Sequence, residues 1–239
     1  MSPSRTRVKV CGITSAADAA AAVRAGADAV GVVLAPSPRQ VSVEAAEEIL
    51  ASVPPFVARV GVFVDAPAKD VAYAVQRLGL TAVQFHGAET PEHCAAANVP
   101  VIKAFRVPVA TNGGDSRTNV GGITEVGARF DVDCVEPYQA RVAAVLLDTY
   151  DPHSHGGTGK TFAWDSITEL PGWAPIVLAG GLTPFNVARA IETVHPFAVD
   201  VSSGVESSPG VKDHALIEAF CVAVRSADAA ASLEKGDAR

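Results

Sequence analysis

Eight short runs rich in Val, Ile and Leu alternate with Ala-rich amphipathic stretches along the whole chain. Nearly continuous apolar runs are typical of parallel strands buried on both faces, and amphipathic stretches between them predict connecting helices. The predicted strands are Val8–Cys11, Ala29–Leu34, Val57–Val64, Ala82–Phe85, Val101–Phe105, Ala143–Leu147, Ile176–Ala179 and Ala198–Val201. The predicted helices are Ala16–Ala25, Val43–Ala51, Ala68–Leu78, Pro91–Ala96, Ala163–Leu170, Pro184–Val194 and Lys212–Val224.

The number of strand–helix units favours one closed architecture. Eight strands match a (β/α)8 TIM barrel, and 239 residues is close to the length of about 250 that is typical of such a barrel. An open, doubly wound sheet is the alternative, but it usually has fewer strands and a topological switch point. We therefore expect a single (β/α)8 barrel domain over residues 1–239.

Two segments depart from the regular alternation. Around residues 107–141 the chain contains the polar stretch Thr111–Asn119, and this connection is longer than a barrel unit needs. We expect an irregular insertion there. From about Ala227 the sequence is polar and Ala-rich, and we expect this tail to fray.

Composition and charge exclude several classes of protein. With 49% hydrophobic and 19% charged residues the chain can bury a sizeable core, and a net charge of −7 argues against a nucleic-acid partner. Met1–Arg7 lacks the apolar core of a signal peptide, and no run of 18 apolar residues predicts a membrane span. We expect a cytoplasmic protein with reduced thiols, because no CxxC pair or zinc spacing links the four cysteines Cys11, Cys94, Cys134 and Cys221. We also expect a monomer, although no feature of the sequence indicates the oligomeric state.

Residues that follow the strands of a (β/α)8 barrel converge on one face, where such barrels keep their chemistry. Taken alone, a cysteine there is more often a small buried hydrophobe, and an aspartate is as often a helix cap as a catalytic group. The set as a whole points to a site. Its members are Cys11-Gly12, Ser37–Arg39, Asp65, His86-Gly87, Arg106, Asp148, Gly180-Gly181 and Ser202–Gly204.

The last two strand ends are rich in glycine and serine, which predicts a phosphate site. Barrels often bind phosphate after strands seven and eight, where backbone N–H groups point at the anion. We expect Thr183 to cap the helix after the seventh strand and Pro184 to be its first residue. The predicted phosphate-binding residues are Gly180, Gly181, Ser202, Ser203 and Gly204.

The glycine-rich stretch Gly156–Thr161 is not a P-loop. A P-loop needs glycine five residues before its Gly-Lys pair, and Ser154 stands there. We expect instead a loop that closes over a ligand, with Gly157 and Gly159 among the substrate-binding residues. The two histidines beside it lack a carboxylate ligand set, so we predict no metal site.

Eight segments of the chain, in their order, resemble those of the phosphoribosylanthranilate isomerase family. The resemblance runs from Lys9 to Asp213, and nothing is transferred from Val107–Arg141, which is longer than we expect for that family. The segments are Lys9–Thr14, Ser37–Ser42, Val60–Val64, Val83–Gly87, Leu146–Asp148, Gly156–Gly159, Leu178–Leu182 and Val199–Glu206.

The resemblance implies an Amadori rearrangement in tryptophan biosynthesis, without metal or organic cofactor. N-(5-phosphoribosyl)anthranilate would become 1-(2-carboxyphenylamino)-1-deoxyribulose 5-phosphate. By similarity Asp148 is the general acid and Cys11 the general base, with Arg39, Gln84 and His86 binding substrate. Each proton-transfer role would typically contribute about 10²–10⁴-fold to the rate.

Two expectations concern charges near Cys11. A thiol that acts as a base at neutral pH needs a lowered pKa, for which Lys9 and Arg39 are the candidate cations. Lys9 shares the inward face of the first strand with Cys11, and a buried lysine is rare unless paired. Asp200 on the eighth strand, the neighbour of the first in a closed barrel, is the expected partner.

Three other functions compete with this interpretation. A related dual-substrate barrel isomerase also serves histidine biosynthesis, but its pattern has aspartates at both catalytic positions, and Cys11 argues against it. A metal-dependent pentose-phosphate epimerase would need histidine and acidic ligands at several strand ends. A catalytically inactive phosphate-binding barrel is the third alternative, against which Cys11 and Asp148 both count.

Overall fold

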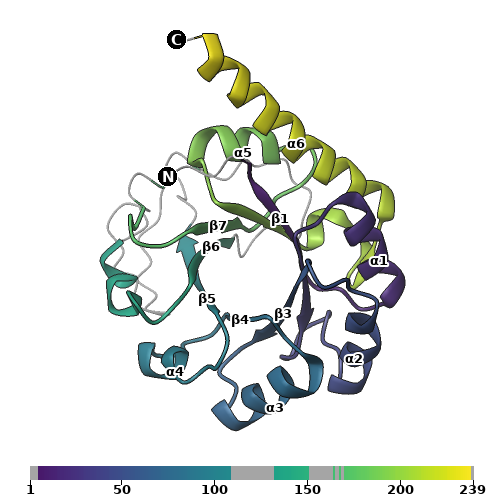
Figure 1. Ribbon diagram of the computed structural model, residues 1–239, viewed down its shortest axis with the longest axis vertical. Helices are drawn as coiled ribbons and strands as arrows, with labels where there is room; N and C mark the ends of the chain where they lie inside the picture. The colour runs from purple at the N-terminus through teal and green to yellow at the C-terminus, as the bar shows by residue number, and fades with distance from the viewer. Residues whose placement is uncertain (1–4, 109–131, 151–163, 165–166, 168–169, 238–239) are drawn as a thin grey trace, which may run out of the picture.

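Eight parallel strands close into a barrel in the order in which they follow along the chain. The barrel is the ring at the centre of Figure 1, which shows the computed structural model. The structure describes residues 5–108, 132–150, 164, 167 and 170–237. The predicted (β/α)8 barrel is confirmed. The strands are β1 Arg7–Val10, β2 Ala29–Val33, β3 Ala58–Phe63, β4 Ala82–Phe85, β5 Val101–Pro108, β6 Ala144–Tyr150, β7 Ile176–Ala179 and β8 Ala198–Val201.

Helices surround this ring on its outer side (Figure 1). In α1, α2 and α4 a serine or threonine side chain accepts a hydrogen bond from the backbone N–H three residues later, so the chain itself specifies where each helix begins. The first three helices have their predicted bounds. The helices are α1 Ala16–Ala25, α2 Val43–Ala51, α3 Ala68–Leu78, α4 Pro91–Ala95, α5 Val187–Val194 and α6 His214–Asp237.

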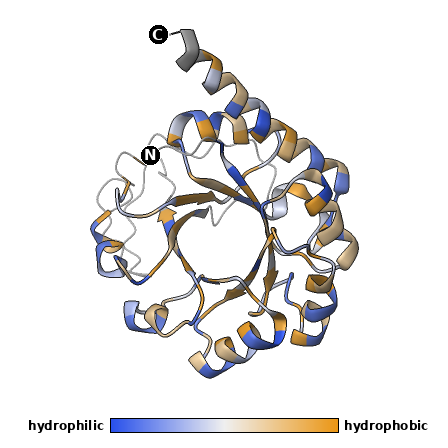
Figure 2. Cartoon of the chain, in the orientation of Figure 1, coloured by the Kyte–Doolittle hydropathy of each residue, from blue (hydrophilic) through white to orange (hydrophobic). Residues whose placement is uncertain are grey.

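Apolar residues fill both faces of the barrel wall. In Figure 2 the strands are mostly orange, whereas the helices carry alternating blue and orange segments. The larger buried cluster packs strand residues such as Val10 and Phe85 against the helices. A smaller cluster contains Ala104, Leu146 and Val177. Because side chains alternate along a strand, Leu146 shares its face of β6 with Asp148, so this cluster lies beneath the strand ends.

The predicted start of the helix after β7 is wrong. The helix begins at Val187 with Asn186 as its N-cap residue, not at Thr183 and Pro184. Asn186 explains the difference, because its Oδ1 accepts from the Thr183 N–H at 2.8 Å and its Nδ2 donates to the Gly181 carbonyl at 2.9 Å. These bonds hold the preceding residues in a separate turn.

The end of the chain also differs from expectation. Lys212 does not begin a helix, because it lies in β10 (Val211–Lys212), which pairs with β9 (Glu206–Ser208) in a small antiparallel sheet. Asp213 then accepts from the backbone N–H groups of Ala215 and Leu216, and α6 follows.

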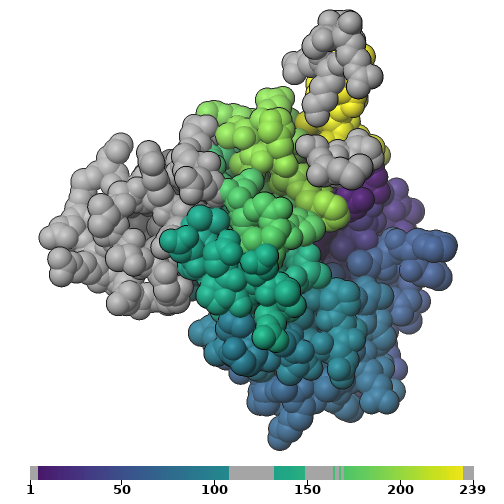
Figure 3. Space-filling view, turned by 60° about the vertical axis from the view of Figure 1, so that its left-hand side comes forward, coloured from purple at the N-terminus to yellow at the C-terminus, as the bar shows by residue number. Residues whose placement is uncertain are grey.

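The segment expected to fray from Ala227 continues as helix α6 to Asp237. This helix extends past the barrel in Figure 1, and its yellow part is visible at the top of Figure 3. Three short 3-10 turns complete the described secondary structure: η1 Val132–Cys134, η2 Glu136–Tyr138 and η4 Ser203–Val205. Residues 109–131 of the predicted insertion and most of the helix predicted at Ala163–Leu170 lie outside the described residues.

Candidate active site

A buried ion pair joins the first and last strands inside the barrel. Lys9 and Asp200 are partners in the β1–β8 register, and Lys9 Nζ donates to Asp200 Oδ2 at 2.9 Å. Their side chains are 4% and 7% exposed, which confirms the predicted pairing of a buried lysine. Within the described residues, Asp200 Oδ1 is buried without a hydrogen-bond partner, so one acceptor remains for a ligand.

Cys11 lies directly above this pair at the carboxyl end of β1. Its backbone N–H donates to the Val201 carbonyl at 2.8 Å, and its side chain is buried. A Cβ atom on Gly31 of β2 would lie 2.9 Å from the Cys11 sulfur and 3.2 Å from Lys9 Nζ. The absence of a side chain at Gly31 therefore leaves room for the thiol and the ammonium side by side.

The pKa of the Cys11 thiol is shifted in the direction opposite to the one expected. Burial raises the pKa of the thiol above its usual value, while the nearby charge of Lys9 lowers it without cancelling the effect of burial. Lys9 thus lowers this pKa in the predicted direction, but the predicted net lowering is wrong, because burial outweighs it. Lys9 itself has a raised pKa, because attraction to Asp200 and Cys11 outweighs the opposing effect of its burial.

Gln84, His86 and Asp148 form a chain of polar contacts across the mouth of the barrel. Gln84 Nε2 lies 3.1 Å from His86 Nδ1, and His86 Nε2 lies 3.0 Å from Asp148 Oδ2. His86 and Asp148 are about a quarter exposed, whereas Gln84 is buried. As predicted, the side chains of Gln84 and His86 share one face.

Electrostatic coupling links these two groups of residues. Burial raises the pKa of Asp200, and beyond the effect of Lys9 this pKa responds to the charges of Asp148 and His86. Asp200 in turn raises the pKa of Cys11. Cys11 and Asp148 therefore lie around the same buried carboxylate, at the carboxyl ends of β1 and β6.

Arg39 is held in place by a network that sequence reasoning missed. Its Nε and Nη2 donate to the two carboxylate oxygens of Glu206 at 2.7 Å each, and Lys212 Nζ donates to Glu206 Oε1 at 2.8 Å. Burial alone would raise the pKa of Glu206, but hydrogen bonds from Arg39 and Lys212 outweigh it, and the pKa is lowered. The carboxylate thus stays charged and fixes the guanidinium of Arg39, whose side chain is 23% exposed.

The two loops predicted to bind phosphate lie against each other. Gly180 and Gly181 have φ values of 81° and 61°, in the left-handed region that favours glycine. A Cβ atom on Gly204 would lie 1.8 Å from the Leu182 carbonyl oxygen, so the loops after β7 and β8 touch at this glycine. Ser202 and Ser203 stand next to this contact, at the start of η4.

Ser202 also connects this region to Arg39. Lys212 Nζ donates to the Ser202 carbonyl at 3.0 Å, and a Cβ atom on Gly12 would meet both Arg39 and Ser202. All predicted site residues that the structure describes therefore surround one end of the barrel. Gly157 and Gly159 lie outside the described residues.

Sequence reasoning missed four charged residues near the site, namely Glu89, Lys103, Glu206 and Lys212. Their side chains are at most 4% exposed, although charged residues are usually found at the surface. One signal was available for Lys103, which interrupts an otherwise apolar predicted strand. Its partner could not be identified in the same way, because Glu89 lies in a loop.

Two further observations concern possible ligands and location. Within the described residues, no group of three or more His, Cys, Asp or Glu side chains has the arrangement of a metal site. No described helix combines the length and the apolar character that crossing a membrane requires.

Comparison with known proteins identifies a family. The family model described as N-(5'-phosphoribosyl)anthranilate isomerase matches residues 8–223. The isomerase of that name from Geobacter metallireducens is 48% identical over 215 residues, which are 90% of this chain and 96% of that protein. The one from Pseudomonas fluorescens SBW25 is 46% identical over 229 residues, which are 95% and 99% of the two chains.

Solved structures agree with the sequence relatives. Phosphoribosyl anthranilate isomerase from Thermotoga maritima is 40% identical with a TM-score of 0.73, and the alignment covers 92% of this chain and 99% of that one. A second isomerase structure, in complex with reduced 1-(o-carboxyphenylamino)-1-deoxyribulose 5-phosphate, is 38% identical with a TM-score of 0.70 over the same shares of the two chains.

Proposed function

The chain belongs to the N-(5'-phosphoribosyl)anthranilate isomerase family, and from this premise we propose how its residues carry out the family's reaction. The protein converts N-(5'-phosphoribosyl)anthranilate into 1-(2-carboxyphenylamino)-1-deoxyribulose 5-phosphate, a step of tryptophan biosynthesis. Substrate and product are isomers, so the enzyme has only to move protons and open a ring.

The chemistry requires one acid and one base. Protonation of the ribose ring oxygen lets its bond to C1 break, which leaves a C1–nitrogen iminium. Removal of the proton on C2 then neutralises the iminium and gives an enolamine. The C2 hydroxyl loses its proton while C1 gains one, and the ketone product results. Positioned side chains typically accelerate each such transfer by about 10²–10⁴-fold.

Asp148 is the proposed acid and Cys11 the proposed base. The observation that carries this assignment is their placement at the carboxyl ends of β6 and β1, around the shared buried carboxylate of Asp200. A (β/α)8 barrel presents its catalytic groups at these strand ends. The contact of His86 with Asp148 supports the role of Asp148, because it fixes the direction in which the carboxyl group points.

Arg39, Gln84 and His86 are proposed to bind the substrate. The Arg39 guanidinium is fixed by Glu206 and partly exposed at the site, which suits a group that meets the anthranilate ring or its carboxylate. Gln84 Oε1 is buried without a partner among the described residues, so it can accept a hydrogen bond from a ligand hydroxyl. Gly157 and Gly159 stay in the proposal as residues that contact substrate.

The phosphate is proposed to bind at Gly180, Gly181, Ser202, Ser203 and Gly204. Support comes from the contact between the two loops and from the open space beside Gly181, where a Cβ atom would meet nothing within 4 Å. Backbone N–H groups in such loops suit a phosphate dianion. The proposed phosphate residues follow β7 and β8, whereas Cys11 and Asp148 stand at the ends of β1 and β6.

We further propose that the chain is one barrel domain that acts as a monomer. The closed ring of eight strands supports the single domain. The four cysteines are free, which is consistent with a reducing cytoplasm.

Substitution of the two catalytic residues tests the mechanism. Cys11→Ser and Asp148→Asn should each lower kcat by roughly 10²–10⁴-fold with a much smaller change in KM, because both groups act mainly in the transition state. The measurement is steady-state turnover of N-(5'-phosphoribosyl)anthranilate in the presence of a chelator. Cys134→Ser is the matched control, since Cys134 lies in η1 and should leave kcat unchanged.

Turnover within a few-fold of the unsubstituted enzyme in Cys11→Ser would show that another group removes the C2 proton. The same result for Asp148→Asn would remove Asp148 from the role of acid.

A further inference from the structure

A second polar cluster lies behind the site, on the helix side of the barrel wall. Lys103 on β5 pairs in register with Phe85 on β4, and Phe85 packs against His93 of α4 with ring centroids 5.1 Å apart. His86, the next residue, faces the opposite way and reaches Asp148. The side chains of Lys103 and its partner Glu89 are 3% and 1% exposed. The proposed mechanism uses neither residue.

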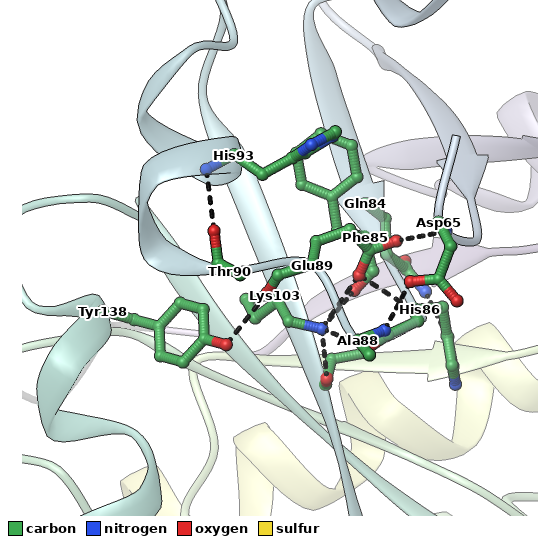
Figure 4. A network of polar contacts seen from close by, with 12 residues as sticks. Asp65, Gln84, Phe85, His86, Ala88, Glu89, Thr90, His93, Lys103 and Tyr138 are labelled. Carbon is green, nitrogen blue, oxygen red and sulfur yellow. Dashed lines mark hydrogen bonds and ion pairs between the residues drawn. The ribbon is translucent and has the colours of Figure 1, made fainter. Parts of the chain in front are cut away.

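Lys103 binds the backbone on both sides of His86. Its Nζ donates to the Gly87 carbonyl at 2.8 Å and lies 3.5 Å from the Phe85 carbonyl. Further contacts are Glu89 Oε2 at 3.1 Å and the Ala104 carbonyl at 3.2 Å. Figure 4 shows these dashed contacts converging on the ammonium group. An ammonium has three donors, and here they are all directed at the end of β4 and its neighbours.

Glu89 binds the same segment from the other side, and we call the Lys103–Glu89 pair, with its bonds to the backbone around His86, the clamp. Its Oε2 accepts from the Gly87 N–H at 2.9 Å, and its Oε1 accepts from the Asp65 N–H at 2.8 Å. Tyr138 donates its hydroxyl to the Glu89 carbonyl at 2.9 Å, while Asp65 Oδ1 accepts from the Ala88 N–H at 2.7 Å. The loop that follows His86 is therefore bonded to Asp65, which lies just after β3, and to β5 and η2 (Figure 4).

A buried ion pair is a poor device for stability alone. Removing two charges from water is costly, and well-packed apolar side chains often stabilise a protein as well or better. What the pair does provide is geometry, because it contacts both peptide groups that flank His86, through the Gly87 N–H at 2.9 Å and the Phe85 carbonyl at 3.5 Å. The His86 ring depends on that backbone for its 3.0 Å contact with Asp148.

We propose that Lys103 and Glu89 are positioning residues that hold His86 against Asp148. This role rests on the proposed function of Asp148 as the acid. Loss of the clamp lets the His86 backbone shift, and the carboxyl group of Asp148 loses its fixed direction. A misplacement of about 1 Å at a reacting group can reduce turnover by about 10²-fold.

Three variants separate positioning from stability. Lys103→Met leaves the Glu89 carboxylate buried without its cation, whereas Lys103→Met/Glu89→Gln removes both charges. Arg77→Met is the control, because the Arg77–Glu47 pair is largely exposed and joins α2 to α3 on the outer surface. For each variant we would measure urea unfolding, kcat and KM, the pH profile of kcat, and the ¹⁵N signals of the His86 ring, assigned with His86→Gln.

The double variant should recover most of the stability that the single variant loses, since no unpaired buried charge remains. Its kcat should nevertheless stay about 10–100-fold below the unsubstituted enzyme, with KM within about three-fold. The pH profile of kcat and the His86 ring signals should change in both Lys103 variants. Arg77→Met should leave all four measurements unchanged.

A double variant with normal kcat and unaltered His86 signals would overturn the positioning role. If the Lys103 variants do not fold, Tyr138→Phe replaces them, since it removes one bond to the Glu89 carbonyl and keeps the ion pair. Unaltered His86 signals in Tyr138→Phe would then count against the clamp. Normal turnover in Asp148→Asn would instead refute the proposed acid, so the two failures are distinguishable.

Discussion

At the scale of single residues, Cys11 stands where burial and charge act in opposite directions. Its thiol is shielded from water, which disfavours the thiolate, and it lies beside the ammonium of Lys9, which favours it. Burial has the larger effect. A thiol with a raised pKa is ionised in only a small fraction of molecules at neutral pH. The thiolate that does form is a stronger base and removes a proton more readily.

The reactivity of Cys11 should therefore rise steeply in alkaline solution. In a variant with the other three cysteines replaced by alanine, alkylation by iodoacetamide should accelerate with pH to beyond about pH 9, because only the thiolate reacts. The acid limb of kcat/KM should follow the same curve, since it reports the free enzyme. A plateau of the alkylation rate below about pH 8 would show that a cation outweighs burial.

Buried charges also show how far single residues can be predicted from the sequence. The Lys9–Asp200 pair was predictable, because both positions lie on inward faces of strands that a closed barrel makes neighbours. The Lys103–Glu89 pair was not, since Lys103 faces the helices and Glu89 lies in a loop without periodicity. Periodic patterns locate faces of regular elements, but they carry no information on a side chain whose partner lies in a loop.

At the scale of elements, apolar patterns located the strands more reliably than their ends. β4, β7 and β8 have their predicted bounds, but β5 and β6 run three residues further than predicted. The parallel ladder continues through Arg106↔Asp148 because backbone groups pair whatever the side chains are. The predicted strands stopped where polar residues begin, but at the mouth of a barrel polar residues can still be part of the strands.

The contact between the β7 and β8 loops gives a test of the phosphate site. Gly204→Ala places a methyl group where the Leu182 carbonyl oxygen now lies, so the two loops must separate. KM should rise by about ten-fold or more while kcat falls less, because phosphate binding is uniform between ground and transition states. Ala188→Gly in α5 is a control for a change of the same size nearby. An unchanged KM, or a fall confined to kcat, would contradict phosphate binding between these loops.

At the scale of the whole molecule, stability and chemistry lie at opposite ends of the barrel. The residue before β1, Thr6, donates its N–H and its hydroxyl to the two oxygens of Asp228 in α6, both at 2.7 Å. The last helix is thereby bonded to the first strand at the amino end, whereas Cys11 and Asp148 lie at the carboxyl end. Substitutions at this amino end should therefore leave the activity intact.

Asp228→Ala should destabilise the fold without impairing catalysis. Loss of both acceptors leaves two donors of Thr6 unpaired, and the free energy of unfolding should fall by about 1–3 kcal/mol. Ser232→Ala, on the exposed face of the same helix, should change it by less than about 0.5 kcal/mol. Urea unfolding measures both variants, and kcat should equal that of the unsubstituted enzyme. A proportional loss of kcat in Asp228→Ala would show that α6 influences the active site.

The ion pair between Lys9 and Asp200 has a consequence for the newly made polypeptide. Its members are 191 residues apart, and they meet only when the eighth strand joins the first. During synthesis, which proceeds from the amino end, Lys9 and Cys11 leave the ribosome long before Asp200 does. Until then the thiol of Cys11 lacks the neighbours that set its pKa, and an incomplete chain contains the cysteine but has no active site. The barrel, and with it the surroundings of Cys11, can therefore form only after Asp200 has been made.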